Sequence, residues 1–443
     1  MEIVEIIIIG SGPGGLAAAY DLAAKGKKVA VVETDLWGGT CPNRGCDPKK
    51  VLYGAIEAQD NLTQLKHHGF ETVPAINWSE LMTFKETFTQ PVSGEQQQGL
   101  ISAGIQTIKG KAIFKDRHTI IVENQEYQAD QIIIATGQRP AILDIPGKEN
   151  FETSTDFLNM KELPEKIVFV GGGYISLELA NIATSSGSEV HVLHHNTRPL
   201  KGFDEELTIA LIDNLKARGI QFHFNESAES ISKENDHYNI VLTSKEILLA
   251  DRVFCATGRI PNVEGLNLEE IGVDFTHKGI VVNDHLQTTV DNIYALGDCL
   301  QKNTPKLTPV SSFEGSYLAK LLSGTLQEAI HYPEIPTIIF SSPKLAQVGL
   351  KEGEVLENEK YEQQNIDLSQ WFTYKHLNES LVKAKIITDK DTGLLVGATV
   401  LGNEAEQLIN LFTLMINQKV VSDKINEMIM LYPTVSSDLS YLY

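Results

Sequence analysis

One arrangement occurs twice in this 443-residue sequence and limits its possible folds more than any other feature. An apolar strand, a glycine-rich turn, a small-residue helix and a second apolar strand follow one another over residues 3–33 and again over residues 166–193. Continuous apolar strands are typical of parallel strands buried on both faces. A glycine-rich turn before a helix lets the backbone approach a pyrophosphate. The sequence therefore predicts an α/β protein with two Rossmann-like dinucleotide-binding domains.

The first turn has the spacing of a nucleotide-binding fingerprint in Gly10, Gly12 and Gly15. Glu33 stands at the tip of the second strand, where a carboxylate can accept hydrogen bonds from a ribose. The same glycines could serve only to pack a helix on a sheet. Because strand, turn, helix and second strand occur in order, we interpret this unit as a nucleotide site.

The second turn carries Gly171 and Gly173, with Ser176 at the position of the third glycine. The acidic ribose ligand is missing from the tip of its second strand. A carboxylate there would repel a 2′-phosphate, whereas basic and neutral donors would accept one. The sequence therefore favours NADPH over NADH, and the candidate phosphate ligands are His194, His195, Arg198 and Lys201.

Two cysteines, Cys41 and Cys46, follow directly on the first nucleotide-binding unit. Only four residues separate them, so the two thiols can close a small ring. The sequence predicts a helix with Asp47 as its N-cap and Pro48 at its first position. Cys46 then stands at a helix N-terminus, which stabilises a thiolate. No second cysteine pair or histidine cluster is spaced to complete a zinc site, so we expect a redox pair and no metal.

Composition excludes other classes of protein. The 58 acidic and 37 basic residues give a formal net charge of −21, which disfavours binding to nucleic acid or anionic membranes. Four cysteines in 443 residues are too few for a disulfide scaffold. The sequence shows neither a signal peptide nor an apolar stretch of membrane-spanning length. We therefore expect a cytoplasmic protein.

The segment around the cysteines, residues 38–50, resembles the redox-active segment of the pyridine nucleotide–disulfide oxidoreductases. This is the flavoprotein family of glutathione reductase and dihydrolipoamide dehydrogenase. The resemblance covers nearly the whole chain. Supporting matches lie at residues 171–178, at the two Ala-Thr-Gly turns ending at residues 137 and 258, and at residues 297–298, 307–310 and 340–343.

The resemblance implies a homodimer whose chains each have four segments. Residues 1–145 would form an FAD-binding domain with the redox pair, and residues 146–262 an NAD(P)H-binding domain. Residues 263–328 would return to the FAD-binding domain. Residues 329–443 would form an α+β dimerisation domain.

By this resemblance the first nucleotide is FAD. Asp298 would bind the ribityl chain, Thr308 would lie near the pyrimidine end of the flavin, and Tyr174 would cover its nicotinamide side. Further residues of the nucleotide sites would be Thr40, Thr136, Gly137 and Gly258.

The resemblance also assigns catalytic roles. Cys46 would be the thiol in contact with the flavin, and Cys41 the outer thiol that attacks the substrate. Glu178 would pair with Lys49 or Lys50 near flavin N5.

The chain departs from the family at the substrate site. Family disulfide reductases carry His-Pro-Thr-x-x-Glu near the C-terminus, but here Tyr432 replaces the histidine and Ser437 the glutamate, with Asp438 one residue on. A positioned acid–base group contributes about 10²–10⁴-fold, so we expect slow turnover of ordinary disulfides unless Tyr432 supplies the proton. Tyr20 and Ser316 replace the two arginines that bind glutathione, so we expect weak binding of glutathione disulfide.

Three functions remain open. The leading one passes electrons from NADPH through FAD and the dithiol to a small-molecule acceptor, a low-molecular-weight disulfide. A second reduces a quinone, a metal ion or oxygen; mercuric reductase is the relevant relative, but its terminal cysteine pair is missing here. A third is a non-catalytic, redox-sensing flavoprotein. The complete dithiol and both dinucleotide sites argue against the third.

Overall fold

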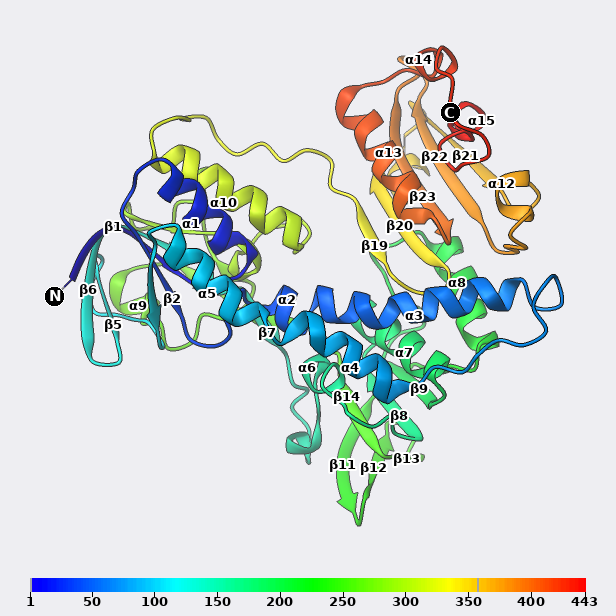
Figure 1. Ribbon diagram of the computed structural model, residues 1–443, viewed down its shortest axis with the longest axis horizontal. Coiled ribbons are helices and arrows are strands. Elements are labelled where there is room, and N and C mark those ends of the chain that lie inside the picture. Colours follow the sequence, from blue (N-terminus) through cyan, green and yellow to red (C-terminus); the bar gives the residue numbers. More distant parts are fainter. Residues whose placement is uncertain (1, 357) are drawn as a thin grey trace. The chain divides into compact units, whose positions relative to one another are not determined.

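The computed structural model describes residues 2–356 and 358–443, and these divide into two compact units (Figure 1). The division passes through two helices, α3 (Cys46–Gln64) and α4 (Trp78–Thr89). Both units contain helices and sheets, so the predicted α/β class is confirmed. The predicted segment boundaries stay predictions. The described residues of the first unit fall in Met1–Val51, Met82–Ala141 and Gly258–His331, and those of the second in Leu52–Leu81, Ile142–Thr257 and Tyr332–Tyr443.

The first unit is built on a largely parallel sheet in the order β3-β2-β1-β6-β5-β4, with β18 also paired to β6. Its central strand β1 is flanked on both sides, and residues 6–9 are almost fully buried. This burial explains why the strand is continuously apolar rather than alternating. The parallel strands are β1 (Glu2–Ile9), β2 (Val29–Glu33), β3 (Gln106–Lys109), β6 (Gln125–Ile134) and β18 (Ile293–Ala295), and the antiparallel ones are β4 (Ile113–Phe114) and β5 (Thr119–Val122).

Two helices of the first unit, α1 (Pro13–Ala24) and α10 (Thr308–Leu322), lie side by side (Figure 1). Glycines permit this close packing, because a Cβ on Gly315 would lie 2.3 Å from the carbonyl oxygen of Gly14. The other elements of the unit are α2 (Thr40–Arg44), α5 (Val92–Ser102), α9 (Leu268–Ile271), η2 (Gly297–Cys299), the pair β7 (Gln138–Pro140) and β15 (Arg259–Pro261), and the pair β16 (Phe275–Thr276) and β17 (Gly279–Ile280).

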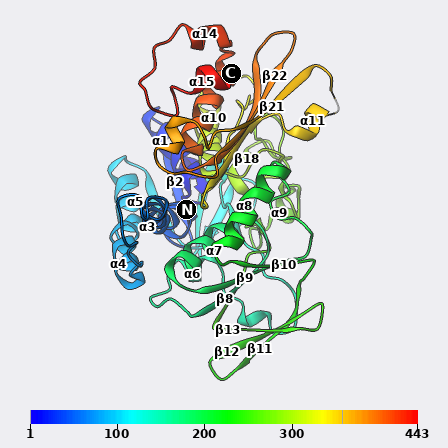
Figure 2. The ribbon, with the colours of Figure 1, turned by 90° about the vertical axis from the view of Figure 1, so that its right-hand side faces the viewer.

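The second unit contains another parallel sheet, in the order β10-β9-β8-β14. The helix α7 (Tyr174–Ser186) connects β8 to β9, as the repeated sequence pattern predicts. Figure 2 shows β11 and β12 as a long hairpin, to which β13 adds antiparallel. The elements are η1 (Lys148–Asn150), α6 (Ser154–Phe157), β8 (Lys166–Val170), β9 (Glu189–His194), α8 (Glu205–Ala217), β10 (Gln221–Phe224), β11 (Ala228–Glu234), β12 (His237–Leu242), β13 (Ile247–Ala250) and β14 (Arg252–Cys255).

The C-terminal part of the second unit is an antiparallel sheet in the order β19-β20-β23-β22-β21. The helix α13 (Ala405–Gln418) packs on β20 and β23 and buries Leu408 and Phe412 there. The remaining elements are β19 (Thr337–Ile339), β20 (Lys344–Gly349), α11 (Glu352–Leu356), β21 (Tyr361–Asp367), α12 (Phe372–Lys375), β22 (Lys383–Asp389), β23 (Leu395–Gly402), α14 (Ser422–Asn426) and α15 (Leu439–Leu442).

Within residues 2–356 and 358–443, no helix is long and apolar enough to cross a membrane. In the same residues, no group of three or more His, Cys, Asp or Glu side chains is arranged to hold a metal ion.

Candidate active site

The first glycine-rich turn is shaped by close backbone contacts. Gly10 has φ +111°, and a Cβ on it would lie 2.4 Å from the carbonyl oxygen of Ala135. A Cβ on Gly15 would lie 2.1 Å from the carbonyl oxygen of Gly10. Gly12, by contrast, precedes the first turn of α1 and faces open space, since a Cβ there would meet no atom within 4 Å. The turn therefore leaves a helix N-terminus accessible to an anion such as a pyrophosphate.

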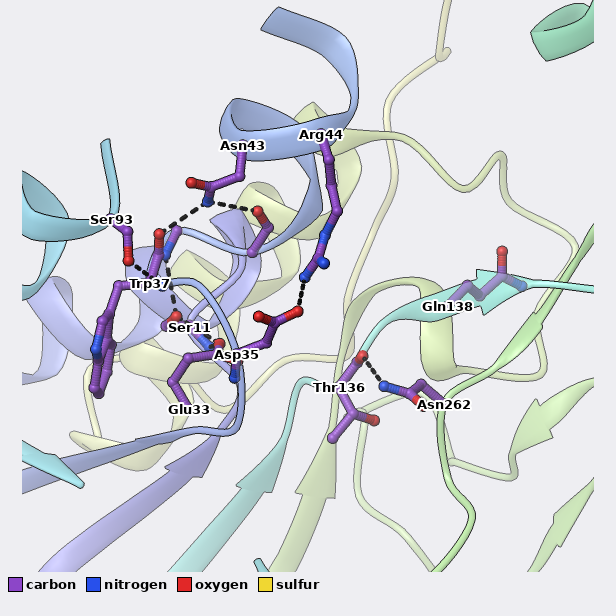
Figure 3. Close-up of polar contacts among 12 residues, drawn as sticks. Ser11, Glu33, Asp35, Trp37, Asn43, Arg44, Ser93, Thr136, Gln138 and Asn262 are labelled. Atoms are coloured by element: carbon purple, nitrogen blue, oxygen red, sulfur yellow. Dashed lines mark hydrogen bonds and ion pairs between the residues drawn. The ribbon is translucent and has the colours of Figure 1, made fainter. Parts of the chain in front are cut away.

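The carboxylate of Glu33 lies at the tip of β2 and is buried (Figure 3). It accepts hydrogen bonds from the backbone N of Ser11 at 3.0 Å and from its hydroxyl at 2.6 Å, and from the N of Asp35 at 2.8 Å. Glu33 thus ties the tip of β2 to the glycine-rich turn. The turn and the expected ribose ligand form one local unit.

The turn after β6 contains Thr136 and Gly137. The Thr136 hydroxyl is buried and has no hydrogen-bond partner in the described chain. Asn262 fixes the turn, because its N donates to the Gly137 carbonyl at 2.9 Å and its side chain to the Thr136 carbonyl at 3.5 Å (Figure 3). An unpaired buried hydroxyl and an open turn at Gly12 fit a polar cofactor such as FAD.

Glycine and asparagine shape the segment that carries the two cysteines. The Asn43 side chain donates to the carbonyl oxygens of Trp37 at 2.9 Å and Gly39 at 2.8 Å (Figure 3). A Cβ on Gly45 would lie 2.9 Å from the Thr40 carbonyl oxygen, so the chain between α2 and α3 requires glycine. Thr40 is the first residue of α2. The sequence analysis did not predict this structural role of Asn43, although the position of Asn43 inside the cysteine motif could have indicated it.

One detail of this segment differs from the sequence-based expectation. The helix α3 begins at Cys46, so Asp47 and Pro48 lie within its first turn instead of at the N-cap and first position. The helix therefore begins directly after Gly45, two residues before Pro48, the expected first position. Arg44, the last residue of α2, forms an ion pair with Asp35 (Figure 3).

The two thiols of the pair are free and have opposite pKa shifts. A hydrogen bond from Cys41, another from Thr308 and the charges of Lys50 and Lys49 lower the pKa of Cys46 to about 6, against an opposing effect of desolvation. The Cys46 Sγ lies 3.6 Å from the Thr308 Oγ1. The hydrogen bond to Cys46, together with burial and the negative charge of the Cys46 thiolate, raises the pKa of Cys41. At neutral pH the thiolate is therefore Cys46.

Asp298 and Thr308 belong to the same unit as the dithiol. Asp298 lies in η2 and is half-buried, and burial raises its pKa above the usual aspartate range. Thr308 is the first residue of α10. The adjacent Gly297 N donates to the buried carboxylate of Glu314, a residue that the sequence did not single out.

The second glycine-rich turn repeats the geometry of the first. Gly171 has φ +118°, and a Cβ on it would lie 2.3 Å from the Ala256 carbonyl oxygen. Gly173 precedes α7 and faces open space, so this helix N-terminus is also accessible. Gly258 has φ +137° and lies where the chain returns to the first unit.

The four expected phosphate ligands lie at or after the end of β9 but differ in their contacts. His194 is buried, with Nε2 2.9 Å from the Arg198 carbonyl oxygen and Nδ1 without a partner, and burial lowers its pKa. His195 and Lys201 are exposed. Arg198 is already paired with Glu205 at 2.8 Å. A phosphate would therefore have to compete with Glu205 for Arg198.

Tyr174 and Glu178 both lie on α7 of the second unit, whereas Lys49 and Lys50 lie in the first unit. Tyr174 is 49% exposed. Glu178 is buried, and its Oε1 accepts a hydrogen bond from the Phe340 N at 2.8 Å. The segment 340–343 thus fixes the Glu178 carboxylate.

The C-terminal acid–base position is held by an exposed aromatic stack. Tyr432 is 66% exposed and stacks on Phe372, with ring centroids 6.2 Å apart. Phe372 stacks in turn on His376 at 5.2 Å. Asp438 does not face Tyr432 as a replacement for the glutamate, because it is buried and accepts a hydrogen bond from Thr373 at 3.1 Å. The stack could not be predicted from a sequence pattern, since its rings come from separate segments.

The two positions at which glutathione-binding arginines would stand carry no charged side chain. The Tyr20 hydroxyl packs against α5, 2.7 Å from where a Cβ on Gly99 would lie, and burial raises its pKa. Ser316 is half-buried on α10.

Comparison with models of known protein families identifies the family of this chain. The pyridine nucleotide-disulphide oxidoreductase model matches residues 4–315, and the dimerisation domain of the same family matches residues 335–442. The chain belongs to this family. The predicted family, fold and class of enzyme, an NAD(P)H-dependent flavin disulfide oxidoreductase, are thereby confirmed. The family is FAD-dependent, and the dimerisation-domain match supports a homodimer.

Two curated relatives and one solved structure match nearly the whole chain. Glutathione reductase from a Nostoc species is 32% identical over 422 residues, covering 91% of this chain and 92% of the relative. Dihydrolipoyl dehydrogenase from Bacillus subtilis is 32% identical over 452 residues, covering 97% and 94%. Among solved structures, the HOCl-induced flavoprotein disulfide reductase RclA from Escherichia coli has a TM-score of 0.90 at 25% identity, covering 99% of this chain and 98% of RclA. RclA has also been solved as a Cu(II) complex.

Proposed function

We propose that the protein is a cytoplasmic, homodimeric enzyme that passes electrons from NADPH through FAD and the Cys41–Cys46 pair to a small-molecule acceptor. The observation that carries this proposal is the lowered pKa of Cys46, about 6, beside a cysteine whose pKa is raised. One thiol held as a thiolate beside a protonated partner is the state that a dithiol reductant needs.

FAD, when bound, would carry the two electrons of the hydride from the nicotinamide to the dithiol. Gly10, Gly12 and Gly15 would hold its pyrophosphate, Glu33 its ribose and Asp298 its ribityl chain. In the reduced pair, Cys46 holds the negative charge and Cys41 holds the proton. Cys41 must lose that proton before it attacks, and the Cys46 thiolate is the base that is hydrogen-bonded to it.

For a disulfide acceptor the chemistry balances without a further reductant. The Cys41 sulfur attacks one sulfur of the acceptor, forms a mixed disulfide and expels one thiolate. Cys46, which has taken the Cys41 proton, passes it on as the first leaving thiolate is protonated. The regenerated Cys46 thiolate then attacks the Cys41 sulfur, forms the Cys41–Cys46 disulfide and expels the second thiolate, which takes a proton from solvent. One turnover consumes NADPH, a proton and one disulfide and yields NADP⁺ and two thiols. Tyr432 of the partner subunit would protonate the first leaving group.

We propose a disulfide other than glutathione disulfide, because Tyr20 and Ser316 supply no charge to its carboxylates. A metal ion is the second candidate acceptor. The Cu(II) complexes of RclA favour it, as does the absence of the acid–base histidine, since a metal ion needs no protonated leaving group. Two Cu(II) ions would take the two electrons of one NADPH.

A panel of acceptors tests the proposal. NADPH oxidation by the purified protein is followed with glutathione disulfide, cystine, coenzyme A disulfide, a quinone, Cu(II) and oxygen, with Cys41→Ser and Cys46→Ser as controls. Turnover of a disulfide or of Cu(II) that both substitutions abolish is expected. Fast reduction of glutathione disulfide would contradict the assignment of Tyr20 and Ser316. Turnover that survives both substitutions would remove the dithiol from the pathway.

The nucleotide preference has its own test. We propose NADPH because His195 and Lys201 offer exposed donors near the position at which Glu33 stands in the first unit. His194 adds no donor while it is neutral, because its Nε2 donates to the Arg198 carbonyl oxygen and leaves Nδ1 as an acceptor. A charge-assisted hydrogen bond is worth about 1.5–3 kcal/mol, so kcat/KM should favour NADPH by at least about tenfold. Lys201→Ala should raise the KM for NADPH and leave that for NADH unchanged. Equal use of NADH by the unmodified protein would refute the assignment.

A further inference from the structure

A buried ion pair in the first unit lies beside the turn expected to bind FAD. The Glu314 side chain on α10 is 0% exposed, and its Oε1 pairs with Lys302, whose side chain is 12% exposed. The other oxygen, Oε2, accepts a hydrogen bond from the N of Gly297 at 2.6 Å. Burying two charges is costly unless they are paired and hydrogen-bonded. Well-packed apolar residues of similar volume often stabilise a core at least as well as a buried ion pair does, so the stability of the fold alone does not account for this pair.

The contacts of the pair converge on the main chain of one turn. Lys302 lies in the connection between η2 and α10, and Lys306 in the same connection donates to the Asp298 carbonyl oxygen at 2.8 Å. Glu314 and Lys306 thus hold main-chain atoms of two adjacent residues, the N of Gly297 and the carbonyl oxygen of Asp298. These groups fix the backbone from which the Asp298 side chain projects.

The same helix also contacts the dithiol. Its first residue, Thr308, lies 3.6 Å from the Cys46 sulfur, and Glu314 follows in its second turn. A side chain that fixes α10 to the Gly297 turn therefore also fixes the position of Thr308. The Cys46 thiolate depends on Thr308, whose hydrogen bond lowers the pKa of Cys46.

We propose that Glu314 is a positioning residue for FAD: its carboxylate orients the Gly297–Asp298 turn, and Lys302 neutralises its charge. The proposal rests on the FAD-binding character of the family and not on the acceptor. It therefore stands or falls separately from the acceptor panel.

The chain supplies a matched control in Glu5. Its carboxylate also accepts a backbone N–H, that of Lys28 at 2.8 Å, and also pairs with a lysine, Lys27, at 3.0 Å. It lies in the first unit but in the middle of β1, whereas the glycine-rich turn follows the end of that strand. Loss of Glu5 removes the same kinds of contact away from the cofactor turn, at a carboxylate that is 37% exposed where that of Glu314 is 0% exposed.

The test measures FAD binding to the apoprotein by quenching of flavin fluorescence, together with thermal unfolding of the apoprotein. Glu314→Ala should weaken FAD binding at least tenfold, and Glu5→Ala should leave it within twofold of the unmodified protein. Glu314→Gln, combined with Lys302→Met so that no charge is left unpaired, should restore binding to within about threefold. The amide oxygen still accepts the Gly297 hydrogen bond.

The rescue separates positioning from general stability. Wild-type affinity in Glu314→Ala, or no rescue by the Gln/Met double variant, would overturn the proposal. Should Glu314→Ala fail to fold, the Ala/Met and Gln/Met double variants are compared, since they differ only in the hydrogen-bond acceptor. Equal FAD affinity of those two would overturn it as well. A wild-type protein that binds no FAD would instead contradict the family's cofactor.

Discussion

The two cysteines have the same chemistry, and their surroundings separate them. Cys46 receives a hydrogen bond from Cys41, another from Thr308 and the field of two lysines, whereas Cys41 faces a thiolate and Asp47. Each thiol therefore shifts the pKa of the other in the opposite direction. The asymmetry makes the Cys46 sulfur the one that carries the charge.

This asymmetry predicts a titration. We expect the ultraviolet thiolate absorbance of the dithionite-reduced protein to rise with a midpoint near pH 6, the value for Cys46. Lys50→Met should move the midpoint upward by up to about one unit, because the lysine charge favours the thiolate. Cys46→Ser should remove this titration. A midpoint above pH 8 in the unmodified protein would show that Cys46 is an ordinary thiol.

A second titratable residue, Glu379, lies in the second unit. Its side chain is 3% exposed, and burial raises its pKa to about 7, although its Oε1 accepts a hydrogen bond from the Asn403 N at 2.6 Å. The folded protein therefore binds a proton here that the unfolded chain has released. The stability it contributes is present below pH 4.5 and is lost as the pH rises through about 7.

We expect Glu379→Gln to remove this pH dependence. Between pH 5 and 8 the free energy of unfolding of the unmodified protein should fall, relative to the variant, by up to about 3 kcal/mol. Chemical denaturation at several pH values measures the difference. Parallel pH profiles for the two proteins would contradict it.

The glycine-rich turns combine glycines whose Cβ would collide with the backbone and glycines that face open space. A Cβ on Gly15 collides with the Gly10 carbonyl, whereas Gly12 and Gly173 have room for one. A substitution at the first kind of glycine disturbs the turn itself. A substitution at the second kind disturbs only what approaches the helix N-terminus.

This difference predicts distinct variants. Gly12→Ala should keep the thermal stability of the apoprotein and weaken FAD binding at least about tenfold, since a methyl group would stand where the pyrophosphate approaches. Gly173→Ala should retain FAD and raise the KM for NADPH. Gly15→Ala should lower the apoprotein melting temperature as well. Equal FAD affinity in Gly12→Ala would contradict the placement of the pyrophosphate.

The assembled protein is expected to bury a surface that a single chain exposes. Ile429, Leu431 and Tyr432 are 101%, 80% and 66% exposed, and they lie in the segment matched by the family's dimerisation domain. Exposed apolar residues clustered in this way mark an interaction surface. A second copy of the chain is the partner that the domain match supports.

We expect the double variant Ile429→Arg and Leu431→Arg to sediment as a monomer at micromolar concentration, whereas the unmodified protein sediments as a dimer. Reduction of bound FAD by NADPH should persist, and acceptor turnover should fall at least tenfold, because Tyr432 would no longer reach the partner's dithiol. Full turnover by the monomer would remove Tyr432 from the mechanism.

Much of the local architecture could be predicted from the sequence. Strand, turn and helix of both nucleotide units were predictable because their signals are local: continuous apolar strands, glycines at fixed spacing and a small-residue helix. The cysteine motif likewise indicated the family. The start of α3 was missed, because Gly45 and the contacts of Asn43 decide where that helix begins.

The sequence by itself determined the fold class, the family and the two redox cysteines, since each depends on residues close together in the chain. Only the tertiary structure placed Thr308 beside Cys46, 262 positions away in the sequence, where its hydrogen bond helps to lower the pKa of Cys46. It also decided that Asp438 points inward, that Glu205 holds Arg198, and that Glu314 binds the Gly297 turn. Those contacts join segments whose distance and burial are set by packing, and packing leaves no periodic pattern in the sequence.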